Sequence, residues 1–307
     1  MTRHSWRDSI PNWNWCEKKL SWTGIPSVIS VIEKKDDFLH PEEKYKELVK
    51  LIKKLGRAAV AFSGGVDSAL LVFAAKEALG DNAVAFTVWS PLLSSKDKIE
   101  VLAFAERYGI RLFKIGHDDL DSRDFCENGP ERCYVCKSKR LDAMLSYAAQ
   151  LEIPWLLDGS NTDDLNDHRP GMKALKESFN VLSPFLECGL SKKEIREISS
   201  SLELPTANKP SAACLASRIP TGTAISEEMI LKVDVGESII RKYLPLDSQL
   251  RMRYDGITAK IETDRENIPG LIKDLSLITD KLTSFGITDV LVVKDGYSMG
   301  GATFRPK

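Results

Sequence analysis

Two adjacent glycines framed by polar side chains stand at residues 62–69, which read Phe62-Ser63-Gly64-Gly65-Val66-Asp67-Ser68-Ala69. Apolar residues 58–62 precede them, and residues 66–79 follow with apolar side chains at helical spacing. The glycines therefore lie at a predicted strand-to-helix turn, where free backbone N–H groups and the positive end of a helix dipole meet. Such a turn can bind a phosphate. The Walker A pattern is absent, so the loop offers no lysine to a transferred γ-phosphate.

A second polar turn follows the predicted strand 155–157 and reads Asp158-Gly159-Ser160-Asn161-Thr162-Asp163-Asp164. Small residues allow a nucleotide to come close, and carboxylates are ligands that Mg²⁺ prefers. We expect Asp163 and Asp164 to bind the ion, with Asp67 as a third candidate. An ordinary turn rich in Asp and Asn explains the same residues without a metal.

Three of the six cysteines have settings that suggest chemistry. Cys133 and Cys136 form a Cys-x-x-Cys pair, which can bind zinc, ligate an iron–sulfur cluster or cycle as a dithiol. The sequence has no second such pair and its four histidines are scattered, so a closed zinc site lacks obvious donors. Cys214 lies in a loop-like stretch between Lys209 and Arg218, and cations favour a thiolate, although many single cysteines are merely small core residues. That plain role is assigned to Cys16, Cys126 and Cys188.

Arginines form the last group of candidate site residues. Arg218, Arg251 and Arg253 carry guanidinium groups, whose fork of donors suits a phosphate or a carboxylate. Alternation along a strand places Arg251 and Arg253 on one face, which favours a shared anion. Surface ion pairs would explain each arginine equally well.

The elements that must position these residues alternate along the chain. We predict a helix from Pro41 that Gly56 closes, and then strands over 58–62, 83–88, 110–115 and 155–157. Helices are predicted over 66–79, 95–108 and 137–150, with the cysteine pair in a loop before the last. This order predicts an α/β fold, a parallel sheet with helices on both faces. Ligands in such folds bind at the carboxyl ends of the strands, where the glycine turn, Thr87 and Asp158 should lie.

The pattern changes after residue 220. A helix over 226–244, a hairpin over 250–262 around Asp255-Gly256, a helix over 267–284 and a strand over 289–293 predict a small α+β domain for substrate binding or oligomerisation. We therefore divide the chain into an N-terminal arm (1–40), an α/β domain (41–220) and a C-terminal domain (221–307). Four tryptophans of the arm should pack on the body or on another subunit, so we expect a homo-oligomer. They are Trp6, Trp13, Trp15 and Trp22.

Composition and charge exclude several classes of protein. The formal net charge of -1 gives no general attraction to nucleic acid or to an anionic membrane. No apolar run approaches the ~20 residues that cross a bilayer, and the N-terminus lacks a signal-peptide pattern. We expect a cytoplasmic protein with a small-molecule substrate, in which the cysteines serve metal or redox chemistry rather than disulfides.

The glycine octet resembles the signature S-G-G-x-D-S of the PP-loop ATP pyrophosphatases. This resemblance implies cleavage of ATP between the α- and β-phosphates, adenylation of a substrate oxygen, and release of pyrophosphate into the glycine loop. Residues Ser63 to Ser68 would then bind ATP. The patch from Gly159 to Asp164 is similar to the G-[ST]-N-x-x-D patch of the same enzymes, which supports Mg²⁺ there.

Longer blocks are similar to the LarE family, the PP-loop sulfur transferases of nickel-pincer nucleotide biosynthesis. The blocks are residues 132–137, 183–196 and 209–218, with Arg251 to Tyr254 and Gly296-Tyr297 in the second domain. The likeness covers roughly residues 42–300. It implies an enzyme that adenylates a carboxylate of a pyridinium dicarboxylate mononucleotide and then installs sulfur.

Two versions of that family differ in the source of the sulfur. In one, a single loop cysteine, matched by Cys214, attacks the adenylate, gives up its own sulfur and ends as dehydroalanine. In the other, two more cysteines, matched by Cys133 and Cys136, join it to hold a [4Fe-4S] cluster with one open iron. The chain has all three cysteines, so we favour the cluster version. A cluster-dependent tRNA thiolase and a nucleotide sensor without turnover remain alternatives, although no basic stripe or RNA-binding module supports the thiolase.

Overall fold

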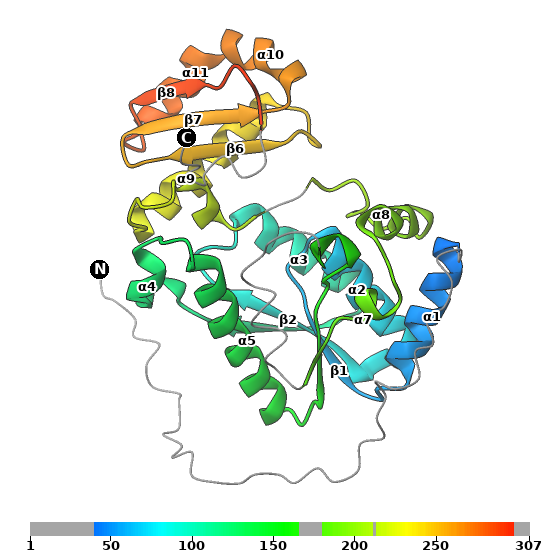
Figure 1. Ribbon diagram of the computed structural model, residues 1–307. Helices are drawn as coiled ribbons and strands as arrows, with labels where there is room; N and C mark the ends of the chain where they lie inside the picture. Colours follow the sequence, from blue (N-terminus) through cyan, green and yellow to red (C-terminus); the bar gives the residue numbers. More distant parts are fainter. Residues whose placement is uncertain (1–39, 166–179, 211–212, 298–307) are drawn as a thin grey trace. The chain divides into compact units, whose positions relative to one another are not determined.

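Five parallel strands form the larger of two sheets, in the order β3-β2-β1-β4-β5 (Figure 1). The structure is a computed structural model that describes residues 40–165, 180–210 and 213–297. The central strands are short apolar runs that are buried on both faces, as parallel strands usually are. The strands are β1 (Ala58–Ala61), β2 (Ala83–Trp89), β3 (Arg111–Gly116), β4 (Trp155–Leu157) and β5 (Val181–Leu182).

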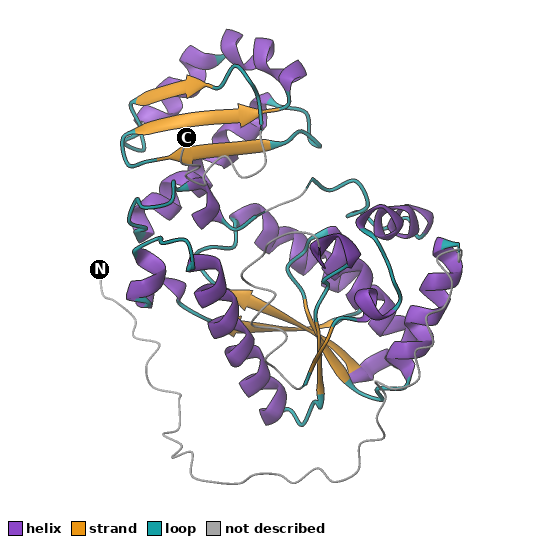
Figure 2. Ribbon diagram, viewed as in Figure 1, coloured by secondary structure: helices purple, strands orange, loops and turns teal. Residues whose placement is uncertain are grey.

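Helices cover both faces of this sheet, as the sequence predicts (Figure 2). One face packs against four helices: α1 (Pro41–Lys53), α2 (Val66–Leu79), α3 (Ser95–Arg107) and α8 (Lys192–Ser201). The other face packs against α5 (Arg132–Gln150), through Leu141 and Ala148. The short helices α4 (Arg123–Cys126) and α7 (Pro184–Glu187) lie in connections.

A smaller three-stranded sheet forms the C-terminal part, in the order β6-β7-β8. Strands β6 (Leu250–Tyr254) and β7 (Thr258–Thr263) form the expected hairpin, and Gly256 adopts φ 102° in its turn. Strand β8 (Asp289–Val292) pairs in parallel with β7. The helices of this part are α9 (Glu227–Ile240), α10 (Ile268–Lys273) and α11 (Leu275–Thr283).

The core of the C-terminal part draws on residues from before the predicted boundary at 220. Leu92, Phe125 and Leu215 belong to the same buried cluster as Val233 and Met252. Segments that follow β2, β3 and β5 therefore contribute to the core of the C-terminal part, and the division at residue 220 stays a prediction.

Two predicted helices differ from the observed ones. Helix α5 begins at Arg132 rather than 137, because the helical pattern starts directly after Gly129-Pro130-Glu131, and the cysteine pair consequently lies on a helix instead of in a loop. The helix expected over 267–284 is two helices, since the chain turns at Asp274 (φ -95°, ψ 4°). Strand β5 and helix α8 were not predicted.

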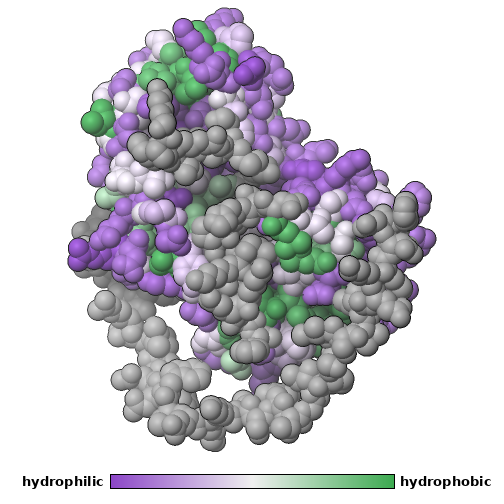
Figure 3. All heavy atoms as spheres, viewed as in Figure 1, coloured by the Kyte–Doolittle hydropathy of each residue, from purple (hydrophilic) through white to green (hydrophobic). Residues whose placement is uncertain are grey.

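The tryptophan arm lies outside the described residues. Within the described part of the chain, no helix is long and apolar enough to cross a membrane. The described surface seen in Figure 3 is mostly hydrophilic, with apolar side chains gathered in a few places.

Candidate functional site

The glycine loop has a geometry that only glycine permits at its first glycine. Gly64 adopts φ 76°, and a Cβ atom added there would lie 2.7 Å from Val101 Cγ2 of α3. The Ser68 hydroxyl holds the loop closed, because it accepts from the Ser63 N–H (3.2 Å) and donates to the Gly65 carbonyl (3.1 Å). Gly65 caps α2 without a side-chain hydrogen bond, so the first N–H groups of this helix remain available to an anion.

The second polar turn lies directly against the glycine loop. A Cβ atom on Gly159 would come within 3.4 Å of both Asp67 Cβ and Ser68 N. Asn161 Nδ2 donates to Asp67 Oδ1 (3.3 Å), and the Lys192 ammonium forms an ion pair with Asp67. The two turns that the sequence singles out therefore meet at the carboxyl ends of the neighbouring strands β1 and β4.

The remaining candidates for nucleotide and Mg²⁺ binding make local contacts. Asp163 Oδ2 accepts from the Lys192 N–H (3.0 Å), and Asp164 Oδ2 accepts from the Asn161 N–H (3.0 Å). Thr87 is buried, and its hydroxyl donates to the Phe62 carbonyl (2.7 Å), which supports the loop from beneath. Direct contact of Thr87 with a nucleotide stays a prediction.

Cys136 and Cys214 lie in one neighbourhood. Both border the C-terminal core cluster, and Cys136 Sγ donates to Asp119 Oδ1 (3.3 Å). Burial raises the pKa of Cys136 to about 12; Arg140 opposes this effect, and Asp119 and Cys214 add to it. Cys133 stands one helical turn before Cys136 and is exposed.

Three thiols thus come from one helix face and one adjacent loop, a donor set that suits an iron–sulfur cluster. Cys133, Cys136 and Arg140 follow each other at spacings of three and four residues, so they share a stripe of α5. Within the described residues, however, no three His, Cys, Asp or Glu side chains converge closely enough to hold a metal ion. Three cysteine thiols are the right kind of ligand for such a cluster. In this structure they do not lie close enough together to bind one.

Two of the three candidate arginines are neutralised by glutamates, of which Glu262 is buried and Glu237 is partly buried. Arg218 forms an ion pair with Glu237 (2.8 Å), and Arg253 forms one with Glu262 (3.0 Å). Arg253 also donates to the Ser217 carbonyl (2.7 Å), which attaches β6 to the loop after Cys214. Leu250, Met252 and Tyr254 of β6 belong to the apolar core cluster, and Arg251 and Arg253 alternate with them along the strand. A shared anion for these two arginines stays a prediction.

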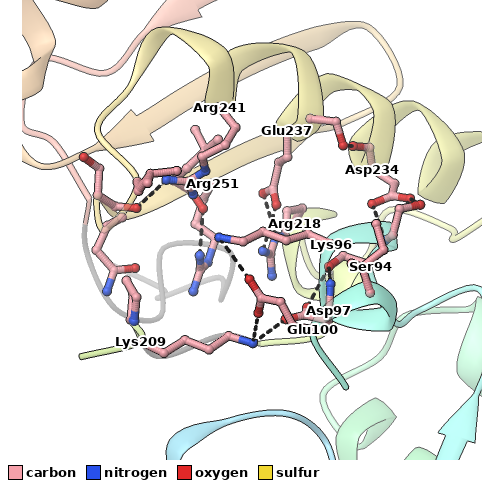
Figure 4. Close-up of a pocket in the computed structure, with 18 residues that line it drawn as sticks. Ser94, Lys96, Asp97, Glu100, Lys209, Arg218, Asp234, Glu237, Arg241 and Arg251 are labelled. Atoms are coloured by element: carbon pink, nitrogen blue, oxygen red, sulfur yellow. Dashed lines mark hydrogen bonds and ion pairs between the residues drawn. The ribbon is translucent and has the colours of Figure 1, made fainter. Parts of the chain in front are cut away.

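A pocket of about 430 Å³ opens beside this arginine group (Figure 4). Lys209 borders it and reaches the glycine loop, because its ammonium donates to the Gly64 carbonyl (2.9 Å). The same ammonium pairs with Asp97 (2.8 Å) and Glu100 (2.6 Å) of α3. The opposite wall is formed by α9 with its C-cap, by β6 and by the turn that follows Cys214. Its charged residues are Arg218, Asp234, Glu237, Arg241 and Arg251.

Charge is unevenly neutralised within the pocket. Burial lowers the pKa of Arg241, and burial together with Arg218 lowers the pKa of Arg251. For Arg218 burial acts in the same direction, but Glu237 outweighs it and the pKa rises. Arg241 makes no ion pair within the described part of the chain, and its Nη1 donates to the Ser248 carbonyl (2.6 Å). The pocket therefore contains one guanidinium, that of Arg241, which no described carboxylate pairs with.

Sequence reasoning missed several of these residues. Lys192 was recognisable only as the first residue after Ser191, whose capping box with Glu194 starts α8. Asp97 had a similar local signal, since it follows the N-cap Ser94. Neither signal reveals that the side chain reaches Asp67 or Lys209, because those partners are more than 100 residues away.

The chain is similar to several known proteins over most of its length. No protein-family model matches the chain. An uncharacterised protein of Synechocystis sp. is 36% identical over 261 residues, which is 84% of this chain and 96% of that protein. The pyridinium-3,5-bisthiocarboxylic acid mononucleotide synthase of Lactiplantibacillus plantarum is 29% identical over 259 residues, or 84% of this chain and 92% of the synthase.

Two further relatives match the chain. An uncharacterised protein of Methanocaldococcus jannaschii is 29% identical over 255 residues, 83% of this chain and 96% of its own. A GMP synthase of Thermosipho melanesiensis is 28% identical over 185 residues, 53% of this chain and 36% of that enzyme. Together with the parallel sheet and its glycine loop, these matches show a PP-loop nucleotide hydrolase-like fold. The chain belongs to the LarE family of PP-loop proteins.

Proposed function

We propose that this protein is an ATP-dependent sulfur transferase. It adenylates a carboxylate of a pyridinium dicarboxylate mononucleotide, releases pyrophosphate, and replaces the activated oxygen with sulfur. One observation carries the proposal: Lys209 connects the glycine loop to the pocket wall, five residues before Cys214. The reaction requires a phosphate-binding loop, an anion-binding pocket and a thiol. The short segment from residue 209 to residue 214 contacts the loop, lines the pocket and carries the thiol.

The activation step uses the glycine loop and the adjoining turn. The open N–H groups at the start of α2 would bind the leaving pyrophosphate, where a helix N-terminus favours negative charge. Asp67, Asp163 and Asp164 are the residues that would hold Mg²⁺, which supplies charge compensation for the phosphates. Adenylation turns the carboxylate oxygen into part of a good leaving group, AMP, so that a sulfur nucleophile can displace it.

The sulfur step uses Cys214. Together with Cys133 and Cys136, it would hold a [4Fe-4S] cluster, which when bound supplies an open iron position for a replaceable sulfide. The stripe of α5 that carries Cys133, Cys136 and Arg140 supports this version, because the helix places both thiols and a cation on one side. In the alternative, Cys214 gives up its own sulfur.

The mononucleotide would bind in the 430 Å³ pocket. Arg241 is the residue we assign to its phosphate, because Arg241 forms no ion pair within the described residues, whereas Arg218 and Arg253 have glutamate partners. Arg251 lines the same pocket. Arg218 and Arg253 would instead hold the loop of Cys214 in place: Arg218 Nη1 donates to the Cys214 carbonyl (3.1 Å). A pocket of this volume lies within the range of small-molecule sites.

The proposal can be tested with protein purified under anaerobic conditions. Pyrophosphate release and the mass of the acceptor are measured with ATP, a sulfide source and the pyridinium dicarboxylate mononucleotide. We expect a thiocarboxylate product, and we expect Cys214→Ala to release pyrophosphate without forming that product. Pyrophosphate release that requires tRNA instead of the mononucleotide would favour a tRNA thiolase and overturn the proposal.

A further inference from the structure

The first turn of α3 is bound by a carboxylate from the C-terminal part of the chain. The Ser95 N–H donates to Asp234 Oδ1 (3.0 Å) and Oδ2 (3.3 Å), and the Ser95 hydroxyl donates to Asp234 Oδ2 (2.6 Å) (Figure 4). These residues are 139 positions apart. Ser95 is the first residue of α3, where free N–H groups and the helix dipole favour a negative charge.

The next turns of α3 hold the glycine loop. Val101 occupies the space beside Gly64 that a Cβ atom would otherwise fill. Asp97 and Glu100 bind the Lys209 ammonium, which donates to the Gly64 carbonyl. A shift of α3 would therefore displace both the apolar and the polar support of this loop.

Asp234 also belongs to the wall of the pocket. Asp234 and Glu237 on α9 and Arg241 at its C-cap follow one another at spacings of three and four residues, so they form one stripe, and all three line the pocket. A ligand bound to this stripe and a nucleotide bound to the glycine loop would thus contact opposite ends of one connected set of side chains.

We propose that Asp234 is a positioning residue for adenylation: by binding Ser95 it fixes α3, and α3 fixes the glycine loop. The inference rests on the proposed function for the identity of the acceptor. In the proposed function Arg241 of this stripe binds the acceptor, so occupancy of the stripe should strengthen ATP binding, and ATP should strengthen acceptor binding by the same factor.

The test compares four single variants of the full chain and the double variant of Asp234→Ala with Ser95→Ala. Asp234→Ala removes the carboxylate, Asp234→Asn keeps an acceptor oxygen for Ser95, and Ser95→Ala removes only the hydroxyl. Glu228→Ala is the matched control, since Glu228 lies on the same helix and its carboxylate pairs with Lys232 at the surface. The dissociation constant of ATP is measured with and without the pyridinium dicarboxylate mononucleotide, together with KM for ATP and kcat for pyrophosphate release.

Asp234→Ala should raise KM for ATP about two- to fivefold with little change in kcat, which matches the contribution of a carboxylate at a helix N-terminus. The ratio of the ATP dissociation constants without and with the acceptor should fall towards one. Asp234→Asn should recover part of both effects, and Glu228→Ala should behave as wild type. In the double variant, Ser95→Ala should add nothing to Asp234→Ala, because both residues act through one contact.

Two results would overturn the inference. One is an Asp234→Ala protein with the ATP affinity and acceptor response of the Glu228→Ala control. The other is equal loss of kcat, ATP binding and thermal stability without recovery in Asp234→Asn, which would indicate a purely structural residue. Failure of the proposed function looks different: wild-type protein would bind ATP without releasing pyrophosphate, and the ATP affinities of the variants would still decide the role of Asp234.

Discussion

Lys209 donates to the Gly64 carbonyl over 2.9 Å while two carboxylates of α3 surround its ammonium. This contact joins the segment that leads to Cys214 with the loop that would bind pyrophosphate. Arg196 fixes the same segment from α8, because it donates to the carbonyls of Ala207 (2.6 Å) and Lys209 (2.9 Å). The thiol and the phosphate loop are therefore held to one framework.

Replacement of this lysine should destabilise the fold. Lys209→Met removes the cation that pairs with the partly buried Asp97 and leaves Glu100 with Lys96 alone. We expect a loss of about 1–3 kcal/mol in the free energy of unfolding, measured with urea. Lys193→Met is the control, since Lys193 forms a surface pair with Glu197 (3.7 Å) and should change stability by about 0.5 kcal/mol or less. Equal effects of the two substitutions would mean that the buried contact contributes no more than a surface pair.

The same contact should make stability depend on pH in the acid range. Burial would raise the pKa of Asp97, but Lys209 and Ser94 outweigh burial and hold it below its usual value. A carboxyl with a lowered pKa in the folded state stabilises the protein above its unfolded pKa of about 4, and this contribution is lost as pH falls through the folded pKa. The free energies of unfolding of wild type and Asp97→Asn, measured with urea at a series of pH values, should converge as the pH falls below about 4. A constant difference between the two curves would contradict this assignment.

Gly64 should tolerate no side chain. Gly64→Ala forces a Cβ atom into Val101 and places alanine at φ 76°, so we expect loss of ATP binding and of about 1–3 kcal/mol of stability. Gly56→Ala separates these causes, because Gly56 has φ 72° and nothing lies within 4 Å of the added Cβ. The measurement is ATP affinity by calorimetry. If Gly64→Ala and Gly56→Ala bind ATP equally well, the loop is not the nucleotide site.

Arg241 should recognise the phosphate of the acceptor. Arg241→Gln removes a guanidinium that has no ion pair within the described residues, and KM for the mononucleotide should rise about tenfold or more. The acceptor without its phosphate serves as the control, since wild type and Arg241→Gln should then have the same KM. An equal rise for both acceptors would assign Arg241 to another part of the substrate or to folding.

Much of this arrangement was predictable from local patterns. The glycine loop, the alternating elements and the Asp-Gly hairpin depend on residues close in sequence, and their predicted positions agree with the structure within a few residues. The partners of the charged residues were not predictable, because the packing of distant elements sets them. Examples are the contact of Lys209 with Asp97 and the contact of Asp234 with Ser95. The cysteine pair was misplaced in a loop, since the pattern at residues 132–136 carries no apolar stripe strong enough to extend the helix.

The central claim is that ATP activates a carboxylate oxygen, and labelled oxygen tests it most directly. The pyridinium dicarboxylate mononucleotide is prepared with oxygen-18 in its carboxylates and incubated with ATP and a sulfide source, and the AMP is examined by mass spectrometry. Adenylation predicts that AMP gains one labelled oxygen for each thiocarboxylate formed. Unlabelled AMP alongside a thiocarboxylate product would contradict the account, because the carboxylate oxygen would then have left by another route.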